Sequence, residues 1–178
     1  MKSKDELLEL ILNDTEAFNE YMQENRNAGV DLSEVDLSDS DVKDLHFINT
    51  DLTSSTFSDS HLVNVKFEEC DLSSADFTRS SVTECDFAGS VLNGADFSYA
   101  VCDYCNFNEA DMAGAVFQET DLSNSDLTSS YNLNACRFDD GTVWPDTDML
   151  PDNFDGMYSS DLSSLQDDED EEDSVSDY

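Results

Sequence analysis

The chain has 178 residues, with 43 acidic residues against 7 basic ones and a formal net charge of −36 at pH 7. A balance this acidic argues against direct binding of nucleic acid, because like charges repel. The sequence has no run of about 18 apolar residues, the length of a membrane-spanning helix, and it turns acidic at residue 5, where a signal peptide would be apolar. We therefore expect one domain with a tail, located in the cytoplasm.

Residues 3–26 are expected to be helical. Two pairs of residues have the spacing of a capping box: Ser3 with Glu6, and Asn13 with Glu16. This predicts either two short helices or one helix kinked near Asn13. We interpret residues 1–29 as a helical cap that covers the first turn of the structure that follows, because the end of a repeat array exposes its core. The alternative is a helix that binds a partner.

From Val30 to Leu127 an apolar residue recurs at every fifth position. A helix repeats near 3.6 residues and a strand near 2.0, so neither explains this period, and a fixed longer period indicates a repeat architecture. A small residue stands two positions before nearly every apolar centre, Leu45 being the exception, and we expect both to point inward. The centres are Leu32, Leu37, Val42, Phe47, Leu52, Phe57, Leu62, Phe67, Leu72, Phe77, Val82, Phe87, Leu92, Phe97, Cys102, Phe107, Met112, Phe117, Leu122 and Leu127.

Phenylalanine occupies alternate centres, one every ten residues, which requires an even number of sides in each turn of the structure. These eight residues are predicted to form the structural core: Phe47, Phe57, Phe67, Phe77, Phe87, Phe97, Phe107 and Phe117.

The repeats closely resemble those of the pentapeptide-repeat proteins. That family's motif is a small residue, Asp or Asn, Leu or Phe, Ser or Thr, and then any residue; residues 75–78, 95–98 and 120–123 match it. The resemblance covers more than half of the chain and implies a right-handed, four-sided β-helix with twenty residues per coil. It therefore predicts an all-β solenoid of five to six coils over residues 30–145, with the phenylalanines stacked on two opposite sides.

After Ser129 the repeat is expected to slip by one residue, with a bulge or loop followed by a partial sixth coil. It resumes with centres at Leu133, Phe138 and Val143. The inward residues two positions before these centres are Tyr131, Cys136 and Gly141, respectively. Trp144 is expected to cover the last coil. Residues 146–178 are predicted to form a turn-rich C-terminal cap and a disordered acidic tail.

The cysteines and histidines are the candidates for chemistry. Cys102 and Cys105 have the spacing of a redox or metal pair, but all five cysteines fall at inward positions, which favours buried, reduced thiols. Cys85 and Cys105 should stack in adjacent coils, where a disulfide is conceivable. His46 and His61 are expected to be exposed on different sides, which disfavours a shared metal. The sequence therefore predicts a protein that is not an enzyme and has no cofactor or metal.

The negative charge of the repeats is the remaining feature that indicates a function. Residues 31–130 contain 21 acidic and 3 basic residues, a net charge of −18. Five coils at about 4.8 Å each make a rod about 24 Å long, and B-DNA of that length carries about 14 charges. Some pentapeptide-repeat proteins resemble duplex DNA in shape and charge and bind type II topoisomerases such as gyrase. The resemblance thus implies a DNA-mimicking binder or inhibitor of a DNA-binding protein.

Two other readings remain open: a general protein-interaction scaffold, and a fold whose acidity is only an adaptation to a salt-rich cytoplasm. The protein is expected to be a monomer or an end-to-end dimer. Candidate partner-binding residues are the aspartates that directly precede a centre and should point outward: Asp36, Asp51, Asp71, Asp76, Asp86, Asp96, Asp111, Asp121 and Asp126.

Overall fold

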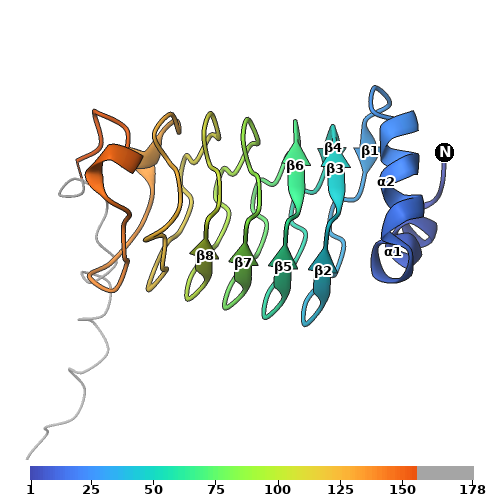
Figure 1. Ribbon diagram of the computed structural model, residues 1–178, viewed down its shortest axis with the longest axis horizontal. Helices are drawn as coiled ribbons and strands as arrows, with labels where there is room; N and C mark the ends of the chain where they lie inside the picture. The colour runs from blue at the N-terminus through green and yellow to red at the C-terminus, as the bar shows by residue number, and fades with distance from the viewer. Residues whose placement is uncertain (156–178) are drawn as a thin grey trace, which may run out of the picture.

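The computed structural model describes residues 1–155, which form a rod-shaped β-solenoid with two helices at its N-terminal end (Figure 1). The predicted all-β solenoid is therefore confirmed. The predicted acidic tail, residues 159–178, lies outside the described part of the chain.

The N-terminal segment forms two helices, α1 (Lys4–Asn13) and α2 (Thr15–Glu24). The capping box at Ser3 is present: the Glu6 N–H donates to Ser3 Oγ at 3.2 Å, and the Ser3 N–H donates to Glu6 Oε2 at 2.7 Å. The second predicted cap was wrong by one residue, because Asp14 caps α2 by accepting from the Ala17 N–H at 3.1 Å.

These helices cover the first coil. Their buried side chains are Leu7, Ile11, Phe18 and Met22. The Phe18 ring meets the Phe47 ring edge-on, with the ring centroids 5.2 Å apart. The Asn19 side chain donates to the Asp44 carbonyl at 2.9 Å and accepts from the His46 N–H at 2.8 Å. The helices thus bury apolar surface and also satisfy part of the open backbone edge.

The strands are short, and every pairing between them is parallel. β1 (Val30–Asp31) pairs with β4 (Thr50–Asp51), β3 (His46–Ile48) pairs with β6 (Lys66–Glu68), and β2 (Asp41–Lys43), β5 (His61–Val63), β7 (Ser81–Thr83) and β8 (Val101–Asp103) form one sheet in that order (Figure 1). Paired residues are twenty positions apart, as Val42 is from Leu62. The predicted coil of twenty residues is therefore present.

All twenty centres are buried, and the phenylalanines among them form two columns. Ring centroids within each column lie 4.6–5.4 Å apart, with nearly parallel planes. The two columns also touch across the interior: Phe67 and Phe77, for example, meet edge-on at 6.4 Å. These cross-contacts join opposite sides of the coil into one core.

The corners of the coil depend on a residue whose role the repeat pattern does not indicate. The residue two positions after each centre has a positive φ, between 46° and 72°, at every repeat from Glu34 to Glu119. Most of these residues are Glu, Asp, Asn, Ser or Gly; the exceptions are Arg79, Tyr99 and Tyr104. A left-handed residue turns the chain sharply, so each pentad ends one side and starts the next.

Near the C-terminus the register shifts twice, where one shift was predicted. Tyr131 pairs with Asp111 at a separation of twenty residues, but the following pairs are separated by 21 and 22. One added residue accompanies the short 3-10 helix η1 (Leu133–Ala135), and the second lies before Val143. Tyr131 and Val143, both predicted inward, are 55% and 48% exposed.

Trp144 takes the inward position instead of Val143. Its ring packs on Phe117 at 6.0 Å, on Phe138 at 5.0 Å and on Phe154 at 4.9 Å, and thereby covers the end of one phenylalanine column. Leu133 and Cys136 are buried as predicted. A second 3-10 helix, η2 (Thr147–Met149), follows, and the Met149 carbonyl accepts from the Leu127 N–H at 2.9 Å.

We expect Phe77→Ala to lower the free energy of unfolding by about 3–5 kcal/mol, because it removes an interior ring of a column and leaves a cavity. Phe77 stacks on both Phe57 and Phe97. Urea unfolding followed by circular dichroism would measure the change. Tyr131→Ala, at an exposed position, should stay within about 0.5 kcal/mol of the wild type. Equal effects of the two substitutions would contradict this account of the core.

Gly114 provides a test of the left-handed corners. Its φ is +72°, and the nearest atom to an added Cβ would be 4.0 Å away, so a substitution there introduces backbone strain without a clash. We expect Gly114→Val to lose about 1–2 kcal/mol of stability. Gly114→Asn should lose less, because Asn tolerates this conformation. Urea unfolding of the two variants would show it, and equal losses would contradict the corner argument.

Candidate functional site

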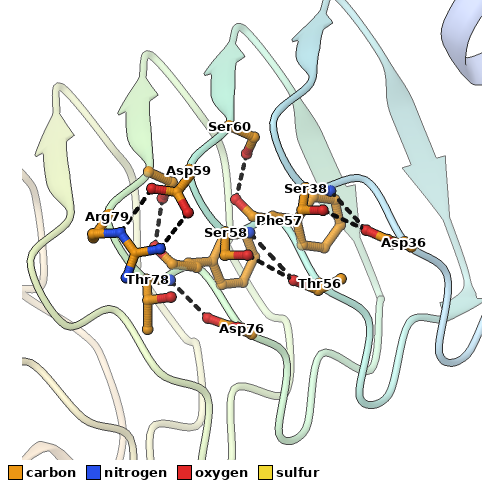
Figure 2. A network of polar contacts seen from close by, with 12 residues as sticks. Asp36, Ser38, Thr56, Phe57, Ser58, Asp59, Ser60, Asp76, Thr78 and Arg79 are labelled. Atoms are coloured by element: carbon orange, nitrogen blue, oxygen red, sulfur yellow. Dashed lines mark hydrogen bonds and ion pairs between the residues drawn. The ribbon is translucent and has the colours of Figure 1, made fainter.

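The nine candidate aspartates all lie on the outer surface, and each one closes a local turn. In every case Oδ1 accepts a hydrogen bond from the backbone N–H two residues later, at 2.8–3.2 Å. At Asp36 the Ser38 hydroxyl also donates to the same oxygen, at 2.7 Å (Figure 2). These aspartates therefore stabilise the coil by Asx turns and also add negative charge to the outer surface.

Hydrogen bonds within the turn lower the pKa of two of these carboxylates, Asp36 and Asp126. Hydrogen bonds from Ser38 lower the pKa of Asp36. At Asp126, burial raises the pKa, but the bonds from Thr128 and Asn108 outweigh it and the net shift is downward. Asp31, which occupies the same repeat position in the first coil, has its pKa lowered to about 2 by Ser33 and Lys4. At these three positions the turn therefore favours the ionised carboxylate as well as holding it in place.

The acidic residues of the repeats are spread over all four sides of the rod. We name the sides after their first centres: the Leu32, Leu37, Val42 and Phe47 sides. Each side carries five or six acidic residues between positions 31 and 130, and none carries more than one basic residue there. The charge thus surrounds the rod and is not confined to one face.

Three of the basic side chains form ion pairs with carboxylates. Arg79 lies on the Leu37 side and donates from Nε to Asp59 Oδ1 at 2.7 Å and from Nη2 to Asp59 Oδ2 (Figure 2). Arg26, just after α2, contacts Glu68 at 3.2 Å. Lys4, in α1, contacts Asp31 at 3.2 Å. The two contacts from the helical segment join it to the first coils, since both acidic partners lie in the solenoid.

The histidines lie on different sides, as predicted. His61, in β5, is exposed. His46, in β3, was also predicted to be exposed but is only partly so, because Asn19 of α2 binds its backbone and Glu68 lies 2.9 Å from its Nε2. The position of the helices, which the repeat pattern does not contain, explains the difference.

The five cysteines are buried and free, as predicted. Burial raises the pKa of Cys70, Cys85 and Cys136 to about 12. A hydrogen bond with Cys105, together with burial, raises that of Cys102. Thiols in this state are poor nucleophiles, so their role in the structure is packing.

Within residues 1–155, no three His, Cys, Asp or Glu side chains are grouped so that they could hold a metal ion. A cleft of about 680 Å³ lies at the C-terminal end, between residues 128–135 and residues 151–154. Its lining is mostly hydroxyl, amide and apolar groups, with Asp152 as its one carboxylate. No helix of the described chain is long and apolar enough to cross a membrane.

Family models match most of the repeat region. A model described as a pentapeptide repeat region matches residues 22–97, and one described as pentapeptide repeats in eight copies matches residues 95–131 and 105–140. The chain belongs to the pentapeptide-repeat family.

Solved pentapeptide-repeat structures are similar at low identity. QnrB1, described as a plasmid-mediated fluoroquinolone resistance protein, is 12% identical over 62% of this chain and 72% of its own, with a TM-score of 0.44. A pentapeptide-repeat protein from the Arabidopsis thaliana thylakoid lumen is 24% identical over 52% of this chain and 68% of its own, with a TM-score of 0.33. The protein alr5209 of Nostoc PCC 7120 is 23% identical, covering 76% and 87%, with a TM-score of 0.34. No curated protein sequence matches.

We expect stability to fall as the pH rises above about 9. The pKa of Cys70, Cys85 and Cys136 is raised on folding from about 9 to about 12, so their contribution is complete below pH 9 and is lost as the pH approaches 12. Urea unfolding at about pH 8 and about pH 11 would measure the loss. A triple Cys→Ser variant should lose less over this range, and an equal loss would contradict the assignment.

Proposed function

We propose that this pentapeptide-repeat protein binds a DNA-binding protein in place of DNA. Its target would be a DNA-processing enzyme such as a type II topoisomerase. The observation that carries the proposal is the distribution of acidic residues over all four sides of a rod, because a DNA-binding channel contacts a duplex from several directions. The protein acts in this proposal as a binding scaffold and not as an enzyme.

The charge density supports the proposal. A net charge of −18 along about 24 Å is roughly one charge per 1.3 Å, against one per about 1.7 Å in B-DNA. The Asx turns at positions such as Asp36 and Asp76 hold the carboxylates in place. A partner would therefore meet charges that are already ordered, and it would lose little entropy on binding.

The mechanism follows from this electrostatic surface. The charged rod would steer a basic partner toward it and compete with DNA for the same cationic groups. Binding would weaken as salt is added, because exposed charges are screened beyond about 8 Å at physiological ionic strength. The cytoplasm is the proposed compartment, and the five free cysteines are consistent with it.

The two alternatives, an interaction scaffold and an adaptation to salt, make different structural demands. A scaffold that binds through its N-terminal helices would need an apolar helix face that is free, but Leu7, Ile11, Phe18 and Met22 are already buried against the solenoid. Acidity as adaptation to salt would predict that the protein unfolds when salt is removed. Circular dichroism at low salt would detect that unfolding.

The test is binding to purified gyrase, using the wild type and a variant with the nine candidate aspartates changed to Asn. Asn can keep the turn, as Asn106 does by accepting from the Asn108 N–H at 3.0 Å, so the variant should fold with about half of the repeat charge. We expect wild-type binding to be displaced by duplex DNA and weakened by salt. The variant should bind more weakly and show a shallower salt dependence.

The matched control is the single substitution Asp36→Asn, which changes the charge by only one unit and should bind almost as the wild type does. Circular dichroism would verify that all variants are folded. The DNA-mimic proposal would be contradicted if neither salt nor duplex DNA reduced binding to gyrase. That result would favour recognition by shape and apolar contact.

A further inference from the structure

Two exposed tyrosines flank β8, the strand of the Val42 side: Tyr99 at the corner between the Leu37 and Val42 sides, and Tyr104 at the next corner. Tyr99 and Tyr104 occupy consecutive corners of one coil, at the two ends of the side that contains Val101–Asp103. Their side chains are 54% and 65% exposed, and Val101 between them is 48% exposed. We call Tyr99, Val101 and Tyr104 the β8 patch. Most of the remaining outer surface of the repeats is hydroxyl, amide and carboxylate.

Folding does not explain why these two corners are aromatic. Both tyrosines have a positive φ, 61° and 54°, a conformation in which Gly and Asn are less strained than a bulky residue. From Glu34 to Glu119 no other corner is aromatic. Because more than half of each ring faces solvent, burial returns little of the backbone cost. Exposed tyrosines on a polar surface are typical of the central residues of a protein interface.

Four acidic residues lie at positions next to the patch. Glu119 is one coil above Tyr99, and Glu84 is one coil below Tyr104, at the same corners. Asp121 pairs with Val101, and Asp103 lies in β8 between Val101 and Tyr104, where its Oδ1 accepts from Asn124 Nδ2 at 2.9 Å. Arg79, one coil below Tyr99, is engaged by Asp59 (Figure 2). The patch therefore presents two exposed aromatic residues with four acidic residues at neighbouring positions: Glu84, Asp103, Glu119 and Asp121.

We propose that the β8 patch is the site where an arginine-rich segment of a protein partner docks. A guanidinium group stacks on an aromatic ring and also pairs with a carboxylate, so it matches both features of the patch. A Lys ammonium matches the charge but stacks less well. This inference rests on the proposed function in one respect, namely that the partner surface is basic.

The experiment is a titration of the full chain with tetra-arginine and tetra-lysine peptides at low salt, followed by NMR of the tyrosine rings. We expect tetra-arginine to shift the signals of Tyr99 and Tyr104 and to bind roughly threefold more tightly than tetra-lysine. Tyr131 is the internal control: it is 55% exposed but lies on the Leu32 side, so its signal should not move.

A double variant, Tyr99→Asn with Tyr104→Asn, separates recognition from folding. Asn suits the left-handed corners, so urea unfolding should show stability equal to or above that of the wild type. The preference for tetra-arginine should fall to about one, while Tyr131→Asn should retain it.

Two outcomes would contradict the proposal that the β8 patch binds an arginine-rich segment. One is an arginine preference that survives in the double variant; the other is tyrosine signals that shift no more at Tyr99 and Tyr104 than at Tyr131. Salt-sensitive binding to gyrase that duplex DNA displaces would leave the proposed function standing in either case. The opposite result is also possible: gyrase binding resists salt and DNA, while the preference for tetra-arginine depends on the two tyrosines. The proposed function would then be contradicted, and the arginine-binding role of the β8 patch would still be supported.

Discussion

The stacking of equivalent side chains every twenty residues is the interaction on which the whole structure depends. Each centre from Leu32 to Leu127 packs on the centre one coil away and is almost completely excluded from solvent. This packing needs a chain that turns after every fifth residue, and the left-handed corners supply the turn. Since the core uses only two positions of each pentad, the other three are available for turns, charge and recognition.

The outer aspartates combine two of these roles. Oδ1 of Asp76 closes a turn with the Thr78 N–H at 2.8 Å, and the same carboxylate contributes to the negative surface (Figure 2). Equivalent positions in adjacent coils are about 4.8 Å apart, where like charges repel. Hydrogen bonds within each turn oppose this repulsion, and the apolar core below holds the coils together. An acidic surface on such a rod is therefore compatible with a rigid backbone.

The ends of the rod and the β8 patch break the symmetry of the repeat. At one end α1 and α2 cover the first coil, and at the other Trp144 covers Phe117. Along the middle, the corner tyrosines distinguish the Val42 side from the other three sides. A uniform charge attracts a basic partner without orienting it, whereas a local aromatic site can fix its position. The two proposals thus assign different tasks to different parts of one surface.

The sequence by itself determined the repeat, its inward positions and the burial of all five cysteines, because a period of five residues leaves only one set of positions for the core. The twenty-residue coil and the two phenylalanine columns followed from the resemblance to the pentapeptide-repeat family together with the spacing of the phenylalanines. Only the tertiary structure decided the features that depend on contacts between distant segments. The helices half-bury His46, two inserted residues turn Val143 outward and Trp144 inward, and consecutive corners place Tyr99 and Tyr104 beside the same strand. The period could not show these features. The burial of His46 depends on helices outside the repeat, and the positions of Val143 and Trp144 depend on a loss of register. The tyrosine corners depend on a backbone conformation that many residue types can adopt.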